Sequence, residues 1–101
     1  MANKQKGLIS INLDKKRNIR FTLNALGEIE DAFGVPLSKI SEIELGVKAV
    51  RTMLWAGLIH EDEDLTEREV GNMVDFDNLE EVQAKVSEAF AVATAKNSQK
   101  A

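Results

Sequence analysis

The chain has 101 residues, of which 44% are hydrophobic and 30% charged, and its formal net charge is −4 at pH 7. This length fits a single core, so we expect residues 1–101 to form one domain with flexible tails at 1–6 and 97–101. The lack of Cys excludes disulfides and thiolate metal sites. The negative net charge disfavours non-specific binding to nucleic acid.

Two short apolar runs near the start predict a β-hairpin. The first run is Leu8, Ile9, Ile11 and Leu13, and the second is Ile19, Phe21 and Leu23. Within each run, alternate residues share one face of a strand. Residues 14–18 are polar and basic, and we expect them to form a solvent-exposed turn. A lone hairpin is marginal in water, so its apolar face must pack on helices.

A helix is predicted from Asn24, which is a good N-cap, to Phe33. Leu26 and Ile29 share its apolar face with Phe33, and Gly34 suits a left-handed stop. Glu28, Glu30 and Asp31 are expected on a solvated outer face rather than in acid–base chemistry. Gly27 inside a helix suggests a close packing contact. Residues 37–44 predict a short helical turn, capped by Ser38 or Ser41.

The most apolar stretch, Leu45 to Ile59, is predicted to be the central buried helix. Its apolar face contains Val47, Val50, Leu54, Gly57 and Leu58 at helical spacing. Small residues (Ala49, Thr52, Ala56) form a strip that would let a neighbouring backbone come close. Arg51 lies at the edge of the apolar face, where we expect its stem on the core and its charge in water.

A His followed by four acids, residues 60–64, raises the question of a metal site. An EF-hand loop would need a Gly in its middle and a Glu at its twelfth position. With one His and no Cys, a zinc site is also uncommon. We therefore expect a solvated acidic loop, and no metal or cofactor.

Thr66 and Glu69 form a capping box, and Leu65 with Val70 form a hydrophobic staple around the start of the next helix. Met73 is expected to face inward with Val70 and Val74, and this helix is expected to end near Asp75. Asp77 or Asn78 is predicted to cap the last helix, which fades at Asn97. Its apolar stripe is Leu79, Val82, Val86, Phe90 and Ala93.

Together these segments predict an α+β fold, an N-terminal β-hairpin followed by a compact bundle of about four main α-helices. The chain has no Gly-rich phosphate loop, no Ser/His/Asp set and no dinucleotide fingerprint, so we expect no enzyme. No apolar run approaches the ~20 residues that cross a bilayer, and residues 1–7 lack a signal-peptide core. The expected location is the cytoplasm.

The order of these segments resembles the small tail assembly chaperones of long-tailed phages, especially the group shared with prophages and gene transfer agents. The resemblance covers about residues 19–75, and the last helix fits by pattern alone. The matching residues are Asn24, Ala25, Leu26, Glu28, Ile29, Glu30, Phe33 and Gly34; Leu54, Trp55, Ala56, Gly57 and Leu58; and Leu65, Thr66, Glu69, Val70 and Gly71.

The resemblance implies a non-enzymatic chaperone that binds the tape measure protein in the host cytoplasm and helps tail tube subunits assemble around it. Self-association is a further expectation. The candidate partner-binding residues are Trp55, Ile59, Met73 and Phe76. Trp55 and Ile59 are large, adjacent by i,i+4 and at the edge of the buried face, and Met73 and Phe76, at the end of the capped helix, would continue the groove. The alternative for these four residues is ordinary core packing. The alternative functions are an acidic prophage-type DNA-binding regulator and a minor structural virion protein.

Overall fold

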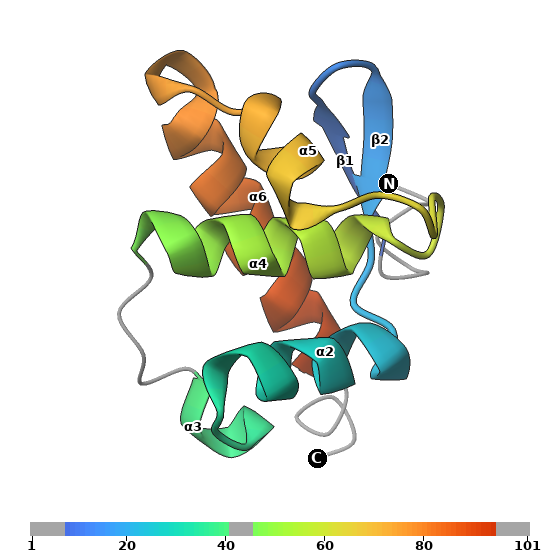
Figure 1. The fold of residues 1–101 in the computed structure, drawn as a ribbon, viewed down its shortest axis with the longest axis vertical. Helices are drawn as coiled ribbons and strands as arrows, with labels where there is room; N and C mark the ends of the chain where they lie inside the picture. Colours follow the sequence, from blue (N-terminus) through green and yellow to red (C-terminus); the bar gives the residue numbers. More distant parts are fainter. Residues whose placement is uncertain (1–7, 41–45, 95–101) are drawn as a thin grey trace.

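The computed structural model describes residues 8–40 and 46–94, and it confirms the α+β class. The expectations for residues 1–6, 41–45 and 97–101 lie outside the described ranges. In the described part, an antiparallel hairpin precedes five helices (Figure 1). The strands are β1 (Ile9–Asn12) and β2 (Lys16–Ile19), and the helices are α2 (Leu23–Phe33), α3 (Leu37–Ile40), α4 (Val47–Leu58), α5 (Glu67–Asn72) and α6 (Phe76–Thr94).

Helix α4 is the centre of the fold, as expected. It contacts α2, α5, α6 and β2, and Figure 1 shows it crossing the middle of the molecule with α6 behind it. Leu54 and Leu58 are fully buried. The end of β2 lies directly on this helix, because the backbone amide of Arg20 donates a hydrogen bond to the carbonyl of Gly57 at 2.8 Å.

The hairpin turn is tighter than predicted. Ile9 pairs with Ile19 and Ile11 pairs with Arg17, so β2 begins at Lys16. The expected exposure of the turn is found for residues 14–16, whereas the expectation is wrong for residues 17–18, which belong to the strand and are not exposed. Arg17 is only 5% exposed. A buried guanidinium needs a charged partner, and Arg17 has one in Asp14.

Helix α2 begins earlier than predicted. Its N-cap is Thr22, whose Oγ1 accepts a hydrogen bond from the amide of Ala25 at 3.1 Å, so the assignment of Asn24 as the cap is wrong. Leu23 therefore leaves the strand pattern and is 84% exposed as the first helical residue. Gly34 ends the helix in the left-handed region with φ 71°, as predicted.

Helix α5 begins with the predicted capping box. Thr66 Oγ1 accepts from the amide of Glu69 at 3.1 Å, and the Glu69 side chain accepts from the Thr66 amide at 3.0 Å. This helix ends at Asn72, earlier than expected. Helix α6 then starts at Phe76, because Asp75 Oδ1 accepts from the amide of Asp77 at 3.0 Å. The prediction of Asp77 or Asn78 as its cap is therefore wrong.

Helix α6 covers the apolar face of the hairpin and the back of α4. It contacts β1 and β2 as well as α4. Val82 and Val86 are buried, and the ring of Phe90 meets that of Phe21 edge to face at a centroid distance of 5.8 Å. The predicted stripe of α6 is thus the surface that joins the hairpin to the helices.

Candidate functional site

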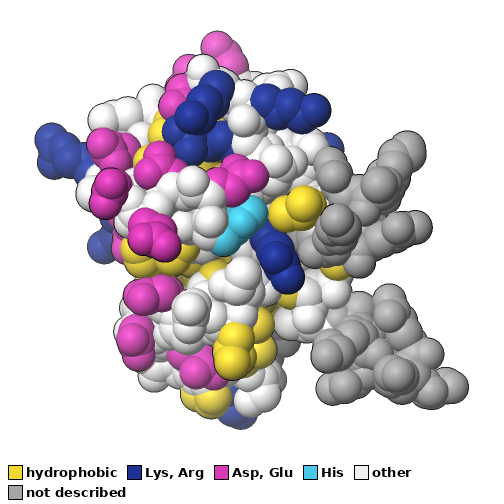
Figure 2. All heavy atoms as spheres, turned by 90° about the vertical axis from the view of Figure 1, so that its right-hand side faces the viewer, with side chains coloured by type: hydrophobic (Ala, Val, Ile, Leu, Met, Phe, Trp, Pro, Cys, Tyr) yellow, Lys and Arg dark blue, Asp and Glu magenta, His cyan; other side chains and the backbone are white. Residues whose placement is uncertain are grey.

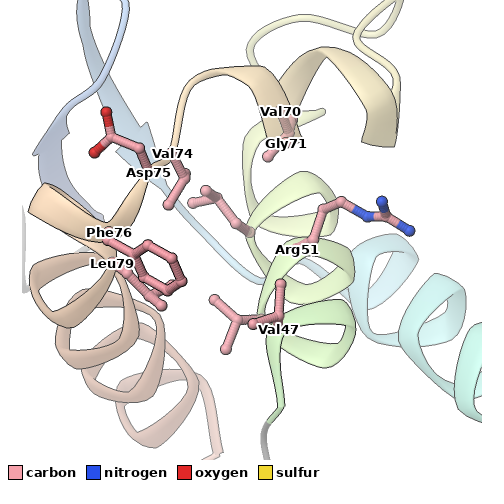
Figure 3. A pocket seen from close by; sticks show the side chains of 10 residues that line it. Val47, Arg51, Val70, Gly71, Val74, Asp75, Phe76 and Leu79 are labelled. Atoms are coloured by element: carbon pink, nitrogen blue, oxygen red, sulfur yellow. The ribbon is translucent and has the colours of Figure 1, made fainter.

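An apolar pocket of about 410 Å³ lies between the N-terminal part of α4, the end of α5 and the start of α6 (Figure 3). Its lining residues are Val47, Val50, Arg51 and Leu54 from α4, then Val70, Gly71, Val74 and Asp75, and finally Phe76 and Leu79 from α6. The four α4 residues fall at positions i, i+3, i+4 and i+7, so they form one face of that helix.

Two of these lining residues leave large apolar side chains in solvent. Val47 is 64% exposed and Phe76 is 90% exposed. The placement of Val47 on a buried face is therefore wrong, because the first turn of α4 extends beyond the helices that cover its middle. In the described ranges, Leu23 is the other large hydrophobic residue that is exposed. Most of this exposed apolar surface is thus gathered at one pocket, which is typical of an interaction site.

Two charged residues flank the pocket. Figure 3 shows Asp75 beside Phe76 on one side, and Arg51 on the other with its guanidinium directed outward. The Arg51 side chain is 41% exposed and its stem lies against Gly71, as expected, although its Nε is buried. Arg51 Nε has no hydrogen-bond partner among the described residues and lies 3.7 Å from Glu67 Oε1. Glu67 in turn accepts a hydrogen bond from Thr52.

The structure does not bring the four candidate partner-binding residues to one place. Phe76 lines the apolar pocket, whereas Met73 lines a second pocket, and neither Trp55 nor Ile59 lines either one. Trp55 is partly exposed, and its indole Nε1 donates a hydrogen bond to the carbonyl of Leu65 at 2.9 Å. That bond ties α4 to the start of α5 and gives Trp55 a structural role.

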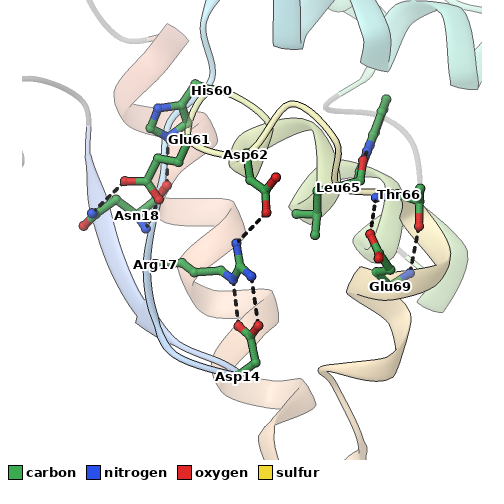
Figure 4. Close-up of polar contacts among 10 residues, drawn as sticks. Asp14, Arg17, Asn18, His60, Glu61, Asp62, Leu65, Thr66 and Glu69 are labelled. Atoms are coloured by element: carbon green, nitrogen blue, oxygen red, sulfur yellow. Dashed lines mark hydrogen bonds and ion pairs between the residues drawn. The ribbon is translucent and has the colours of Figure 1, made fainter.

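The second pocket, of about 670 Å³, is polar and lies between the hairpin turn and α5. It is lined by Leu13, Asp14, Arg17, Asp62, Asp64, Leu65, Glu69, Asn72 and Met73. Arg17 donates two hydrogen bonds to the carboxylate of Asp14, at 2.7 and 2.9 Å, and lies 3.8 Å from Asp62 (Figure 4). The bonds from Arg17 lower the pKa of Asp14 to about 2.

The acidic loop after α4 is exposed but attached to β2. The side chain of Glu61 accepts two hydrogen bonds from Asn18, and His60 Nε2 lies 2.8 Å from the Asn18 carbonyl oxygen (Figure 4). Figure 2 shows acidic side chains gathered to one side of the single His. Among the described residues, no three His, Asp or Glu side chains are grouped so that they could hold a metal ion.

Sequence reasoning missed most of the apolar pocket. The stripe of Val47, Val50 and Leu54 was visible, but the sequence could not show that the first turn of this helix is left uncovered by its neighbours.

No family model, no curated protein and no solved structure matches this chain. Within residues 8–40 and 46–94, no helix combines the length and apolar character needed to cross a membrane.

Proposed function

We propose that this chain is a phage or prophage tail assembly chaperone, which binds the tape measure protein in the host cytoplasm and keeps it from aggregating. The observation that carries the proposal is the apolar pocket with the exposed Phe76 at its rim. The resemblance of residues 19–75 to this family supports the same function. The tail tube protein is a further proposed partner.

The pocket has the geometry for binding a helix. Its α4 wall runs from Val47 to Leu54, which at 1.5 Å per residue is about 10 Å, or two helical turns. A guest helix would place apolar side chains at i, i+3, i+4 and i+7 along that wall, as in other helix-in-groove complexes. The tape measure protein of this family is a long helical chain with apolar stretches, so its chemistry suits this pocket. We call the protein that the chaperone binds its client.

Co-expression with the cognate tape measure protein tests the proposal. We expect the parent chain to keep the client in the soluble fraction, and Phe76→Asp to leave it in the pellet, because a carboxylate cannot enter an apolar pocket without a partner. Leu23→Asp is the matched control, since Leu23 is nearly as exposed as Phe76 but lies on α2 and does not line the pocket.

Both variants must first show the helical circular dichroism of the parent. If folded Phe76→Asp solubilises the client as well as the parent does, the pocket is not the client surface. Ile59→Asp provides the corresponding test of the sequence-based candidates outside the pocket.

A further inference from the structure

We propose that, without a client, the apolar pocket is covered by a second copy of this chain in a two-fold symmetric dimer. This inference goes beyond the proposed function and does not depend on it, because it concerns only the purified protein. In such a dimer the same surface patch is used on both subunits, so the patch must be complementary to itself. The patch around Phe76 meets that condition in shape and in charge.

The shape is self-complementary because a projecting side chain lies beside a recess. Phe76 exposes 90% of its surface at the rim of a pocket of about 410 Å³ whose walls are mainly Val and Leu. A two-fold axis through the pocket brings the Phe76 ring of each copy over the pocket of the other. Both rings and both Val47 side chains are then removed from water. Burial of apolar surface is the main favourable contribution to the free energy of most protein association.

The charges are self-complementary because opposite signs lie on opposite sides of the pocket. Asp75 shares one side with Phe76, and Arg51 is on the other side (Figure 3). The same two-fold axis exchanges the sides, so Asp75 of each copy approaches Arg51 of the other. A patch with only one sign of charge would repel its own copy.

Both groups have hydrogen-bonding capacity left for this contact. The Arg51 side chain is 41% exposed although its Nε is buried, and among the described residues its acidic neighbour is Glu67, 3.7 Å from Nε. Asp75 uses Oδ1 to cap α6, and among the described residues Oδ2 accepts no hydrogen bond. The pairs of a dimer are therefore formed without breaking a hydrogen bond of the monomer.

Sedimentation of the purified full chain over a range of concentrations is the first test. We expect a species of twice the 11.2 kDa chain mass that dissociates on dilution. Phe76→Ser should weaken dimerisation at least about tenfold, because each dimer loses two buried rings. The control Leu23→Ser should leave the dimer unchanged. A parent chain that is monomeric at every concentration would overturn the proposal, as would a dimer that Phe76→Ser does not weaken.

Charge exchange is the second and more specific test. Arg51→Glu and Asp75→Lys should each abolish the homodimer, because both of its cross-pairs become like-charged. Mixed in equal amounts, the two variants should form a heterodimer, because both cross-pairs are then opposite in charge. A mixture that remains monomeric would count against this arrangement. Asp75→Lys also removes the α6 cap, so Asp75→Asn, which keeps a capping side chain, is the second variant and should weaken the homodimer without that loss.

Discussion

Two helical glycines have opposite surroundings, although both lie inside predicted helices. A Cβ atom on Gly57 would lie 2.5 Å from Ile19 Cγ2, so β2 packs on α4 at a distance that only Gly allows. A Cβ atom on Gly27 would meet no heavy atom within 4 Å, so the expectation of a close contact there is wrong. The sequence places Gly57 on the apolar face of its helix and Gly27 beside Glu28, and this difference, rather than the presence of a glycine, indicated which one lies in a close contact.

These surroundings predict opposite effects of the same substitution. Gly57→Ala should lower the free energy of unfolding by about 1–3 kcal/mol through overpacking against Ile19. Gly27→Ala should raise it by up to about 1 kcal/mol, because Ala restricts the unfolded chain and favours helix. Urea denaturation of the two variants beside the parent measures both. A more stable Gly57→Ala variant would mean that the hairpin does not lie this close to α4.

The bond between Asp14 and Arg17 predicts a dependence of stability on pH. Because the folded pKa of Asp14 is about 2 and its ordinary value is 3.8, the charged carboxylate stabilises the fold above about pH 4, and this contribution is lost as the pH falls through 2. Asp14→Asn should therefore be less stable than the parent at pH 7, with a difference that shrinks between pH 4 and pH 2.

The size of this effect is below about 1 kcal/mol, because the Asp14 side chain is 46% exposed and solvent screens the pair. Asp31→Asn is the control, since Asp31 lies on the exposed side of α2. Denaturation midpoints at pH 7, 4 and 2 provide the comparison. An Asp14→Asn difference that persists at pH 2 would show that the loss comes from packing and not from charge.

At the level of elements, the N-terminal ends of the helices show which features of the fold can be predicted from the sequence. Thr66 was identified because Glu69 completes a reciprocal pair that few alternatives match. At α2, two capping residues, Thr22 and Asn24, stand two positions apart, and either could start the helix. In the structure Thr22 is the N-cap, because its Oγ1 accepts a hydrogen bond from the amide of Ala25, and the sequence does not distinguish the two candidates.

The capping box predicts the cost of removing its first residue. Thr66→Ala should destabilise the chain by about 1 kcal/mol, because the amide of Glu69 loses its acceptor. Thr94→Ala is the matched control: its hydroxyl donates to the Phe90 carbonyl at the end of α6, where it caps no amide. Thermal melting of the two variants distinguishes the effects. Equal melting temperatures for Thr66→Ala and the parent would place the helix start elsewhere.

For the molecule as a whole, the central position of α4 predicts cooperative unfolding. Leu54 is fully buried on the helix that contacts α2, α5, α6 and β2. Leu54→Ala should cost about 2–5 kcal/mol, a large part of the stability of a domain this size. Trp55 fluorescence and far-ultraviolet circular dichroism should give coincident transitions in the parent and the variant. A Leu54→Ala variant with the stability of the parent would show that α4 is not the centre of the hydrophobic core.

At this scale, the sequence predicted the class and the order of elements, because hydrophobic periodicity reports which face of each element is buried. It did not predict the apolar pocket. Phe76 was among the candidates, but Val47 was assigned to the core, because periodicity does not show where cover by neighbouring elements stops. Exposure of an apolar residue depends on the lengths and placement of other helices, which no single segment encodes.

The pairing of the first and last elements also sets when the protein can finish folding. β1 begins at Ile9, yet the helix that covers it runs to Thr94, and Phe21 meets Phe90 across that contact. During synthesis at roughly 5–20 residues per second, several seconds separate the hairpin from α6. Throughout that interval the apolar face of the hairpin lacks its cover. The nascent chain therefore cannot complete this packing until α6 has been synthesised.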